Sequence, residues 1–248
     1  MKNKFWLSAI LVATLLSCKA PMSISQIETQ NNIKINESIT SDATFTKVIE
    51  PYKQALQDKM NEKISHTSID LTKNGDNSNL GNLLADYTLN GAKEWAKNNN
   101  IPQIDAAVVN IGGIRNNIHK GDILLRHIFE VMPFENELVV VKMKGSDLHH
   151  IFTYYLETQK NNPVSGFFIE TENGSINKAL INGKEVDKNA NYYIATSDYL
   201  ALGGDNMKFF SKGEMITTGL KLRDLYIGIF RKTPEVIAPT DTRLIFKK

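Results

Sequence analysis

The chain has 248 residues, of which 42% are hydrophobic and 23% are charged. This composition supports one packed domain with a tail and argues against a disordered chain. The formal net charge is +2, but Lys2 and Lys4 belong to a leader that we expect to be removed, so the mature chain is predicted to be neutral. A neutral chain lacks the basic excess typical of nucleic-acid-binding proteins, and no nucleic-acid partner is predicted.

The first 17 residues have the pattern of a bacterial signal peptide. Lys2 and Lys4 form a basic n-region. An apolar run from Phe5 to Leu16 follows, and it is too short to span a bilayer. The segment Leu15-Leu16-Ser17-Cys18 resembles a lipobox, which predicts that Cys18 becomes the lipid-modified first residue. Cys18 is the only cysteine, so an intramolecular disulfide is excluded. We therefore expect a lipid-anchored protein of the cell envelope, on the periplasmic side or at the cell surface; the alternative is a plain secretory signal with an incidental cysteine.

Residues 18–44 are rich in Ser, Asn, Gln and Thr and have no clear period, which predicts a polar tether before a folded domain at 45–248. The domain then alternates between helical and strand patterns. The expected elements are an amphipathic helix at Phe45–Lys63, a strand at Ser65–Leu71, a helix from Asn79, a strand at Ile104–Val109, a short helix at Ile123–Val131, a strand at Leu138–Met143, a helix that begins at Gly145, two or three strands that include an Asn182-Gly183 turn and Tyr192–Thr196, a helix over Leu222–Phe230 and a strand at Arg243–Phe246. This alternation predicts a mixed α/β domain built in layers.

Four loop segments between these elements carry residues suited to a ligand. Asn79-Leu80-Gly81-Asn82 opens a helix, where its amides either cap the helix or contact a ligand. The segment Asn110 to Arg115 contains Gly112 and Gly113, which let a ligand approach the backbone, and Arg115 offers a planar fork for a phosphate or carboxylate. The alternative for this second segment is an ordinary Gly-Gly turn beside a solvated Arg115.

The other two segments each present an aromatic ring. Phe134 follows Pro133 on a stiff loop, unless the ring belongs to the core. Tyr199 and Asp205 lie on either side of the Gly203-Gly204 pair, where Asp205 could also serve only local backbone donors. Two rings can stack on a flat base, a carboxylate can accept both ribose hydroxyls, Asn110 can meet a ring edge and an Arg can meet a phosphate. Together the loops predict a nucleotide site.

The order Asn-Leu-Gly-Asn, Asn-x-Gly-Gly-Ile-Arg, Pro-Phe-x-Asn and aromatic-Leu-Ala-x-Gly-Gly-Asp resembles the C-terminal, substrate-binding domain of the 5'-nucleotidase family, from about Phe45 to the C-terminus. The resemblance implies mixed sheets in a layered α-β-β-α arrangement. It also implies that Phe134 and Tyr199 stack on the base, that Asp205 holds the ribose hydroxyls, and that Asn136 matches an Asn of the base-binding loop. The implied substrate-binding residues are Asn110, Gly112, Gly113, Arg115, Phe134, Asn136, Tyr199, Gly204 and Asp205.

Two departures from the family pattern affect individual residues. Family enzymes often carry a substrate-binding Arg just before the Asn-Leu-Gly-Asn helix start, where this chain has Asp76 and Asn77. The second aromatic residue is Tyr199 where Phe is usual, so the ring is kept but its hydroxyl needs a partner.

A third departure concerns metals. Of the family's two-metal motifs, Gly-Asn-His-Asp/Glu and Gly-His-x-His do not occur in this sequence, and the one Asp-x-His match, Asp147-Leu148-His149, stands without them. His149 and His150 are adjacent on an expected helix, where successive side chains diverge by ~100°, and each histidine is interpreted as a surface or packing residue. No catalytic residue, metal or cofactor is therefore predicted in this chain.

Three functions remain open from the sequence. The favoured hypothesis is the substrate-binding half of a 5'-nucleotidase-type hydrolase for extracytoplasmic nucleotide catabolism, which binds a nucleoside 5'-monophosphate or nucleoside. A separate metallophosphoesterase chain would then carry the divalent metal pair. The alternative is a non-catalytic nucleotide- or nucleoside-binding lipoprotein, and the third possibility is a degenerate domain kept for protein contact.

Overall fold

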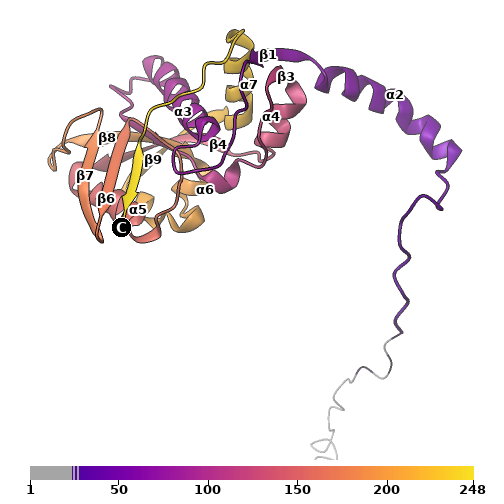
Figure 1. Cartoon of the computed structure of the whole chain (residues 1–248), viewed down its shortest axis with the longest axis horizontal. Coiled ribbons are helices and arrows are strands. Elements are labelled where there is room, and N and C mark those ends of the chain that lie inside the picture. Colours follow the sequence, from indigo (N-terminus) through magenta and orange to yellow (C-terminus); the bar gives the residue numbers. More distant parts are fainter. Residues whose placement is uncertain (1–23, 25, 27) are drawn as a thin grey trace, which may run out of the picture. The chain divides into compact units, whose positions relative to one another are not determined.

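The computed structural model describes residues 24, 26 and 28–248 (Figure 1). The predicted signal peptide at 1–17 and the lipid-attachment residue Cys18 lie outside the described residues and stay predictions. Contacts divide the chain into residues 1–48 and a compact unit of residues 49–248. The described residues before Ala43 form no helix or strand, and the first described helix begins there, two residues before the predicted domain boundary.

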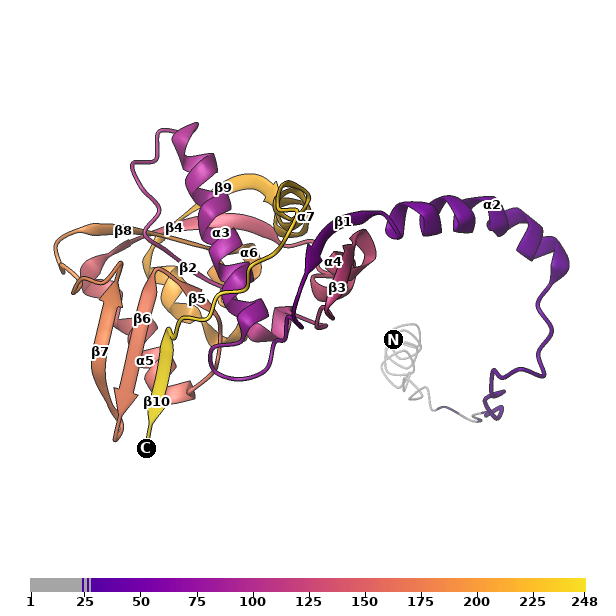
Figure 2. The ribbon, with the colours of Figure 1, turned by 45° about the horizontal axis from the view of Figure 1, so that its top comes forward.

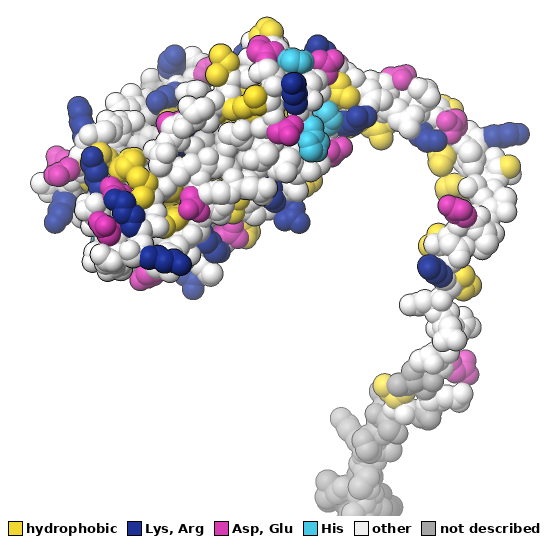
Figure 3. Space-filling model, in the orientation of Figure 1, with side chains coloured by type: hydrophobic (Ala, Val, Ile, Leu, Met, Phe, Trp, Pro, Cys, Tyr) yellow, Lys and Arg dark blue, Asp and Glu magenta, His cyan; other side chains and the backbone are white. Residues whose placement is uncertain are grey.

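Helix α2 (Ala43–Met60) starts on an aspartate cap and has no buried residue. The Asp42 carboxylate accepts the backbone N–H groups of Thr44 at 2.7 Å and Phe45 at 3.0 Å. The helix ends three residues before the predicted Lys63, because Lys63 already belongs to a strand. Hydrophobic side chains lie along this helix in Figure 3, and they are Phe45, Val48, Ile49, Tyr52 and Leu56. None of the helices in the described part of the chain is long and apolar enough to cross a membrane.

A five-stranded mixed sheet forms the centre of the domain. Its order is β5 (Val164–Ser165), β2 (Ala106–Val108), β8 (Asn191–Ser197), β4 (Glu137–Lys144) and β9 (Glu214–Lys221). Strands β2 and β8 run parallel, and the other neighbours are antiparallel. Side chains alternate along β4, so that Leu138 and Val140 enter one core while Val139 and Val141 enter another. Strand β4 is therefore buried on both faces.

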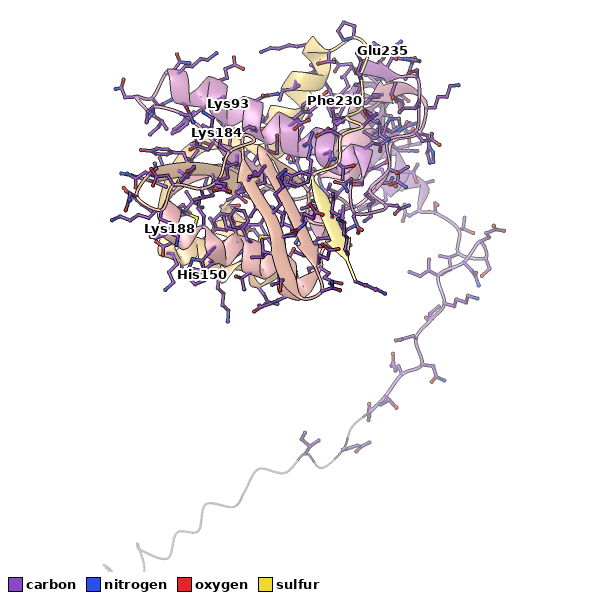
Figure 4. The ribbon with its side chains drawn as sticks, turned by 60° about the vertical axis from the view of Figure 1, so that its left-hand side comes forward. Lys93, His150, Lys184, Lys188, Phe230 and Glu235 are labelled. Atoms are coloured by element: carbon purple, nitrogen blue, oxygen red, sulfur yellow. The ribbon has the colours of Figure 1, made fainter. Side chains whose placement is uncertain are left out.

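The first core lies between this sheet and the helices α3 (Asn79–Lys97), α4 (Leu125–Val131) and α7 (Leu222–Lys232). Figure 2 shows α3 and α7 on the same side of the sheet. Phe230 of α7, labelled in Figure 4, packs edge-to-face on Tyr87 of α3 with 5.3 Å between ring centroids. The hydroxyls of Thr88 and Tyr226 are 2.8 Å apart and also join these two helices. Apolar packing and one buried hydrogen bond thus fix α7 against α3.

The second core lies on the other face of the sheet. It contains α5 (His149–Thr158) and a three-stranded sheet in the order β10 (Leu244–Lys247), β6 (Phe167–Glu172) and β7 (Ser175–Ile181). Strand β10 pairs in parallel with β6, and a separate antiparallel pair joins β1 (Lys63–Thr67) to β3 (Gly121–Leu124). The predicted mixed α/β class with several mixed sheets is confirmed.

Other predicted boundaries are also wrong, and three of them have a local cause. The strand expected at Ser65–Leu71 ends at Thr67, because the Thr67 hydroxyl bonds the Ile69 carbonyl at 2.9 Å in a local turn. The helix expected from Ile123 starts at Leu125, because Ile123 pairs with β1 and Leu124 keeps an extended backbone. At Gly145 the chain first makes a 3₁₀ turn, and α5 begins at His149.

The C-terminal strand is tied to the start of α3 by Asn77 and Arg243. The Asn77 side chain accepts the N–H groups of Arg243 at 2.7 Å and Leu244 at 3.0 Å and donates to the Leu244 carbonyl at 2.7 Å. The buried Arg243 guanidinium bonds the carboxylates of both Asp86 and Asp241. These contacts place β10 in its sheet, which confirms the strand predicted at Arg243–Phe246.

Candidate functional site

The sheet topology brings three of the predicted loops to one edge. Strands β2 and β8 run parallel, so their C-terminal ends, which lead to Asn110 and Tyr199, lie at the same edge. Strand β4 runs antiparallel to β8, so its beginning, just after Asn136, also lies there. The Asp198 carboxylate fixes this junction, because it accepts the backbone N–H groups of Tyr199 at 2.8 Å and Glu137 at 3.1 Å.

A cavity of about 400 Å³ opens between these loops, a size within the usual range for small-molecule sites. Eight of the nine predicted binding residues line it, and the ninth, Gly204, lies directly against the Tyr199 ring. A Cβ atom at Gly204 would come within 2.5 Å of that ring, so this close approach requires glycine. The lining residues are Asn110, Gly112, Gly113, Arg115, Phe134, Asn136, Tyr199 and Asp205.

The two aromatic rings of the cavity face solvent. Phe134 and Tyr199 are each 44% exposed, and neither belongs to a core cluster. The core interpretation of Phe134 is therefore wrong. Exposure of a large apolar ring to water is unfavourable in the free protein. Two such rings in one cavity therefore suit a ligand with a flat apolar face.

The Asp205 carboxylate is held by two of its neighbours. Its Oδ2 accepts the Asn110 side-chain amide at 2.8 Å, and its Oδ1 accepts the Tyr199 hydroxyl at 3.0 Å. The Asp205 backbone is left-handed, with φ of 51°, and its N–H donates back to the Tyr199 hydroxyl at 3.2 Å. The partner that the sequence required for this hydroxyl is thus Asp205. A carboxylate offers about four acceptor positions, so roughly two remain for a ligand.

A buried polar layer behind the cavity was missed by sequence reasoning. The Tyr154 hydroxyl of α5 donates to the Asp205 carbonyl at 3.2 Å and accepts from the Asn162 side chain at 2.9 Å. The Asn162 Oδ1 accepts the Ile111 backbone N–H at 3.0 Å, which links the two loops. Burial, and next the nearby charge of Asp205, raise the pKa of Tyr154, so it stays a neutral donor. No local motif marks Tyr154 or Asn162, because their role appears only when the loops meet.

Arg115 offers the cationic group of the cavity. Its backbone N–H is anchored to the Val131 carbonyl at 2.9 Å, while its Nη1 makes a hydrogen bond of 3.1 Å to the Gly112 carbonyl. The side chain is otherwise exposed toward the cavity mouth. The remaining guanidinium donors can meet a phosphate or carboxylate in the forked geometry that arginine favours.

The Asn79 segment does not line this cavity. The Asn79 side chain accepts the Thr72 N–H at 2.7 Å and donates to the Asp70 carbonyl at 3.0 Å, while Ser78 caps the helix by accepting the Gly81 N–H at 3.2 Å. Asn77, which with Asp76 stands where the resemblance implies an Arg, is bonded to β10 as described above. The helix is thus capped by Ser78, the Asn79 side chain bonds the loop before the helix, and the ligand-contact interpretation of this segment is not supported.

The histidines make separate local contacts. The Nδ1 of His127 accepts the Leu124 backbone N–H at 3.1 Å, and that of His66 pairs with Glu235 at 2.7 Å. The prediction that the His149 and His150 side chains diverge is wrong: the ring centroids are 3.8 Å apart at the helix start. Among residues 24, 26 and 28–248, no group of three or more His, Cys, Asp or Glu side chains is placed to hold a metal ion.

Comparisons with known proteins place the chain in a family. The family model described as "5'-nucleotidase, C-terminal domain" matches residues 58–212. The chain is 30% identical over 192 residues to Protein UshA of Yersinia enterocolitica, which covers 71% of this chain and 32% of the relative. It is 28% identical over 182 residues to a 5'-nucleotidase of Vibrio vulnificus, covering 69% of this chain and 31% of the relative.

A solved structure supports the fold. The crystal structure of a 5'-nucleotidase precursor from Thermus thermophilus matches with a TM-score of 0.69 at 23% identity, over 83% of this chain and 43% of that one. The chain thus spans about a third of the UshA and Vibrio relatives and less than half of this structure. The match to the family model covers more than half of the chain, and the protein belongs to the 5'-nucleotidase C-terminal domain family.

Proposed function

We propose that this chain binds a nucleoside 5'-monophosphate, or its nucleoside, as the substrate-binding part of a 5'-nucleotidase-type hydrolase. The single observation that carries the proposal is the cavity in which Phe134 and Tyr199 are exposed beside Asp205 and Arg115. A base would stack on the rings, each stack contributing about 1–3 kcal/mol. Asn110 and Asn136 lie where they can meet polar edges of the base or sugar.

The ribose would bind through Asp205. With one hydrogen bond already accepted by each carboxylate oxygen, the two free acceptor positions match the two adjacent hydroxyls of a ribose. Hydrogen bonds to a charged group contribute roughly 1.5–3 kcal/mol each. Arg115 would meet the 5'-phosphate. The proposed ligand therefore uses each kind of group that the cavity presents.

We further propose that hydrolysis takes place on a separate metallophosphoesterase chain in the cell envelope, with Cys18 as the lipid anchor of this chain. The donor side chains in the described residues do not fit a divalent metal pair, so no catalytic step is assigned to them. In this chain the residues bind and orient the nucleotide only.

Phosphate release from AMP tests whether this chain binds the nucleotide while a separate chain hydrolyses it. The purified chain with added divalent metal should release negligible phosphate, and addition of a metallophosphoesterase encoded by a neighbouring gene should give turnover. Metal-dependent hydrolysis by the chain alone would overturn the assignment of chemistry to a partner. Tight AMP binding without turnover in either mixture would support the alternative, a non-catalytic nucleotide-binding lipoprotein.

A further inference from the structure

The loop that presents Phe134 is held by a segment about ninety residues later in the chain. Lys221, Leu222 and Arg223 lie where β9 ends and α7 begins. The Leu222 backbone N–H donates to the Asn136 carbonyl at 2.9 Å, and the Lys221 ammonium donates to the Glu135 carbonyl at 3.1 Å. Both contacts hold the backbone on the C-terminal side of the Phe134 ring.

Arg223 holds the other side of the loop. Its Nη1 donates to the Pro133 carbonyl at 3.1 Å and reaches the Met132 carbonyl at 3.5 Å, and its Nη2 forms an ion pair with Glu135. The guanidinium lies 4.4 Å from the centre of the Phe129 ring, which adds a cation–π contact. The side chain is only 12% exposed. Arg223 is thus a nearly buried cation that contacts the end of α4 and bonds the loop that follows it.

The chemistry of this loop explains why an arginine suits the position. Four carbonyls, those of Met132, Pro133, Glu135 and Asn136, accept hydrogen bonds from residues 221–223. Arginine presents several donors in a rigid plane and no acceptor, so one side chain can bond two adjacent carbonyls and a carboxylate. The loop backbone is therefore fixed on both sides of Phe134, while the Phe134 ring itself remains exposed.

We propose that Arg223 is a positioning residue of the nucleotide site, which holds Phe134 and Asn136 in the geometry that receives the base. Arg223 does not line the cavity, so it acts through the loop and not on the ligand. A loop fixed before binding loses less conformational freedom when the ligand arrives, which raises affinity. The inference rests on the proposed function, since it names what prepares that site.

Substitution of Arg223 by methionine tests the proposal, because methionine keeps an unbranched apolar stem but no donors. The Arg223→Met chain should bind AMP about tenfold more weakly, measured by calorimetry, and bind ribose 5-phosphate as the unchanged chain does. Ribose 5-phosphate has no base and does not use Phe134. An equal loss for both ligands, or no loss for AMP, would overturn the positioning role.

A matched control is available on the same helix. Arg231 also makes an ion pair, with Glu62 at 2.7 Å, but it lies away from the cavity. Arg231→Met should leave AMP affinity within twofold of the unchanged chain, with any loss confined to thermal stability. A loss of AMP affinity equal to that of Arg223→Met would show a general effect of α7 and overturn the proposal.

Two further variants test the proposal, a double substitution and a milder single substitution. In the Phe134→Ala chain, Arg223→Met should cause a smaller loss of AMP affinity than in the unchanged chain, because only Asn136 is then left for it to position; full additivity would contradict the proposal. If Arg223→Met fails to fold, Glu135→Gln removes only the ion pair and should speed amide hydrogen exchange in the ligand-free chain at Leu222, whose N–H bonds the Asn136 carbonyl. Unchanged exchange in that variant would overturn the proposal.

Failure of the inference and failure of the proposed function are distinguishable in these data. If the unchanged chain binds AMP and Arg223→Met binds it equally well, only the positioning role is overturned. If the unchanged chain binds neither AMP nor ribose 5-phosphate, the proposed function is overturned and the positioning role with it.

Discussion

Two segments have nearly the same composition, Asn79-Leu80-Gly81-Asn82 and Asn110-Ile111-Gly112-Gly113. Their first asparagines nevertheless have different kinds of hydrogen-bond partner. The Asn79 amide bonds the backbone of Thr72 and Asp70. The Asn110 amide instead bonds a carboxylate that itself faces the cavity. The difference follows from position: the first segment starts a helix, whereas the second leaves the end of a parallel strand at an edge where other loops meet.

The two regions thus contain different kinds of side chain: some complete the fold, and others remain able to bind a ligand. Near the start of α3, polar groups find partners within the domain, so their loss should reduce stability. At the edge of the sheet, polar and aromatic groups keep unused capacity, so their loss should reduce binding. Each of the following predictions changes one region and measures stability, binding or both.

The largest effect is expected at Asn77, which binds the C-terminal strand. Asn77→Ala removes three hydrogen bonds and leaves two backbone N–H groups and one carbonyl of Arg243 and Leu244 without partners. The free energy of unfolding should fall by roughly 2–4 kcal/mol, measured by urea denaturation. AMP affinity should be unchanged.

Asn99→Ala is the matched control for this prediction. The exposed Asn99 side chain makes one hydrogen bond, of 2.8 Å, to the Trp95 carbonyl. Its loss should change the free energy of unfolding by less than about 1 kcal/mol. A selective loss of AMP affinity in Asn77→Ala would assign the start of α3 to the binding site and contradict the comparison.

The next largest effect is expected at Asp205. Asp205→Asn keeps the side-chain shape and tolerates the left-handed backbone, but it removes the charge that we propose accepts the ribose hydroxyls. AMP affinity should fall by about 2 kcal/mol, roughly 30-fold. Calorimetry on Asp205→Asn and on the exposed control Asp187→Asn should show the loss only in the former. Equal affinities would remove Asp205 from the site.

Phe134→Ala should weaken AMP binding by roughly 1–2 kcal/mol, because one stacking surface is lost. Stability should hardly change, since the ring is largely exposed and lies outside both cores. The control Ile237→Ala removes an apolar side chain that is 86% exposed and distant from the cavity lining. A fall in stability without a fall in affinity would place the Phe134 ring in the core after all.

The smallest effect is expected when the Tyr199 hydroxyl alone is removed. Tyr199→Phe keeps the ring but frees one oxygen of Asp205. Affinity for adenosine should fall by about 0.5–1 kcal/mol, while affinity for 2',3'-dideoxyadenosine should stay the same because that ligand does not use Asp205. An equal fall for both ligands would mean that the hydroxyl acts on the base and not through Asp205.

Much of the fold could be predicted because it rests on local patterns. The run Leu138–Met143 is apolar and β-branched, and β4 is buried on both faces. Strand β9 was missed because it lies at the sheet edge, mostly exposed, and so shows no apolar alternation. The boundaries near Thr67 and Leu125 could not be placed because pairing and a local turn, not composition, end those elements.

The cavity residues could be predicted only as a set. Tyr199, Asp205 and Asn110 stand next to strand ends, and resemblance to a family supplied the order of the motifs. The supporting residues could not be found in this way. Tyr154, Asn162 and Arg223 lie in or beside helices whose patterns describe packing, and their contacts with the loops exist only in the folded chain.

Amide chemical shifts recorded during an AMP titration test the central claim most directly, because they report binding and its location together. The account predicts saturable changes that cluster at Asn110–Arg115, Phe134–Asn136 and Tyr199–Asp205, with little change at Asn77–Asn82. Absence of saturable changes at millimolar AMP, or changes centred on Asn77–Asn82, would contradict it.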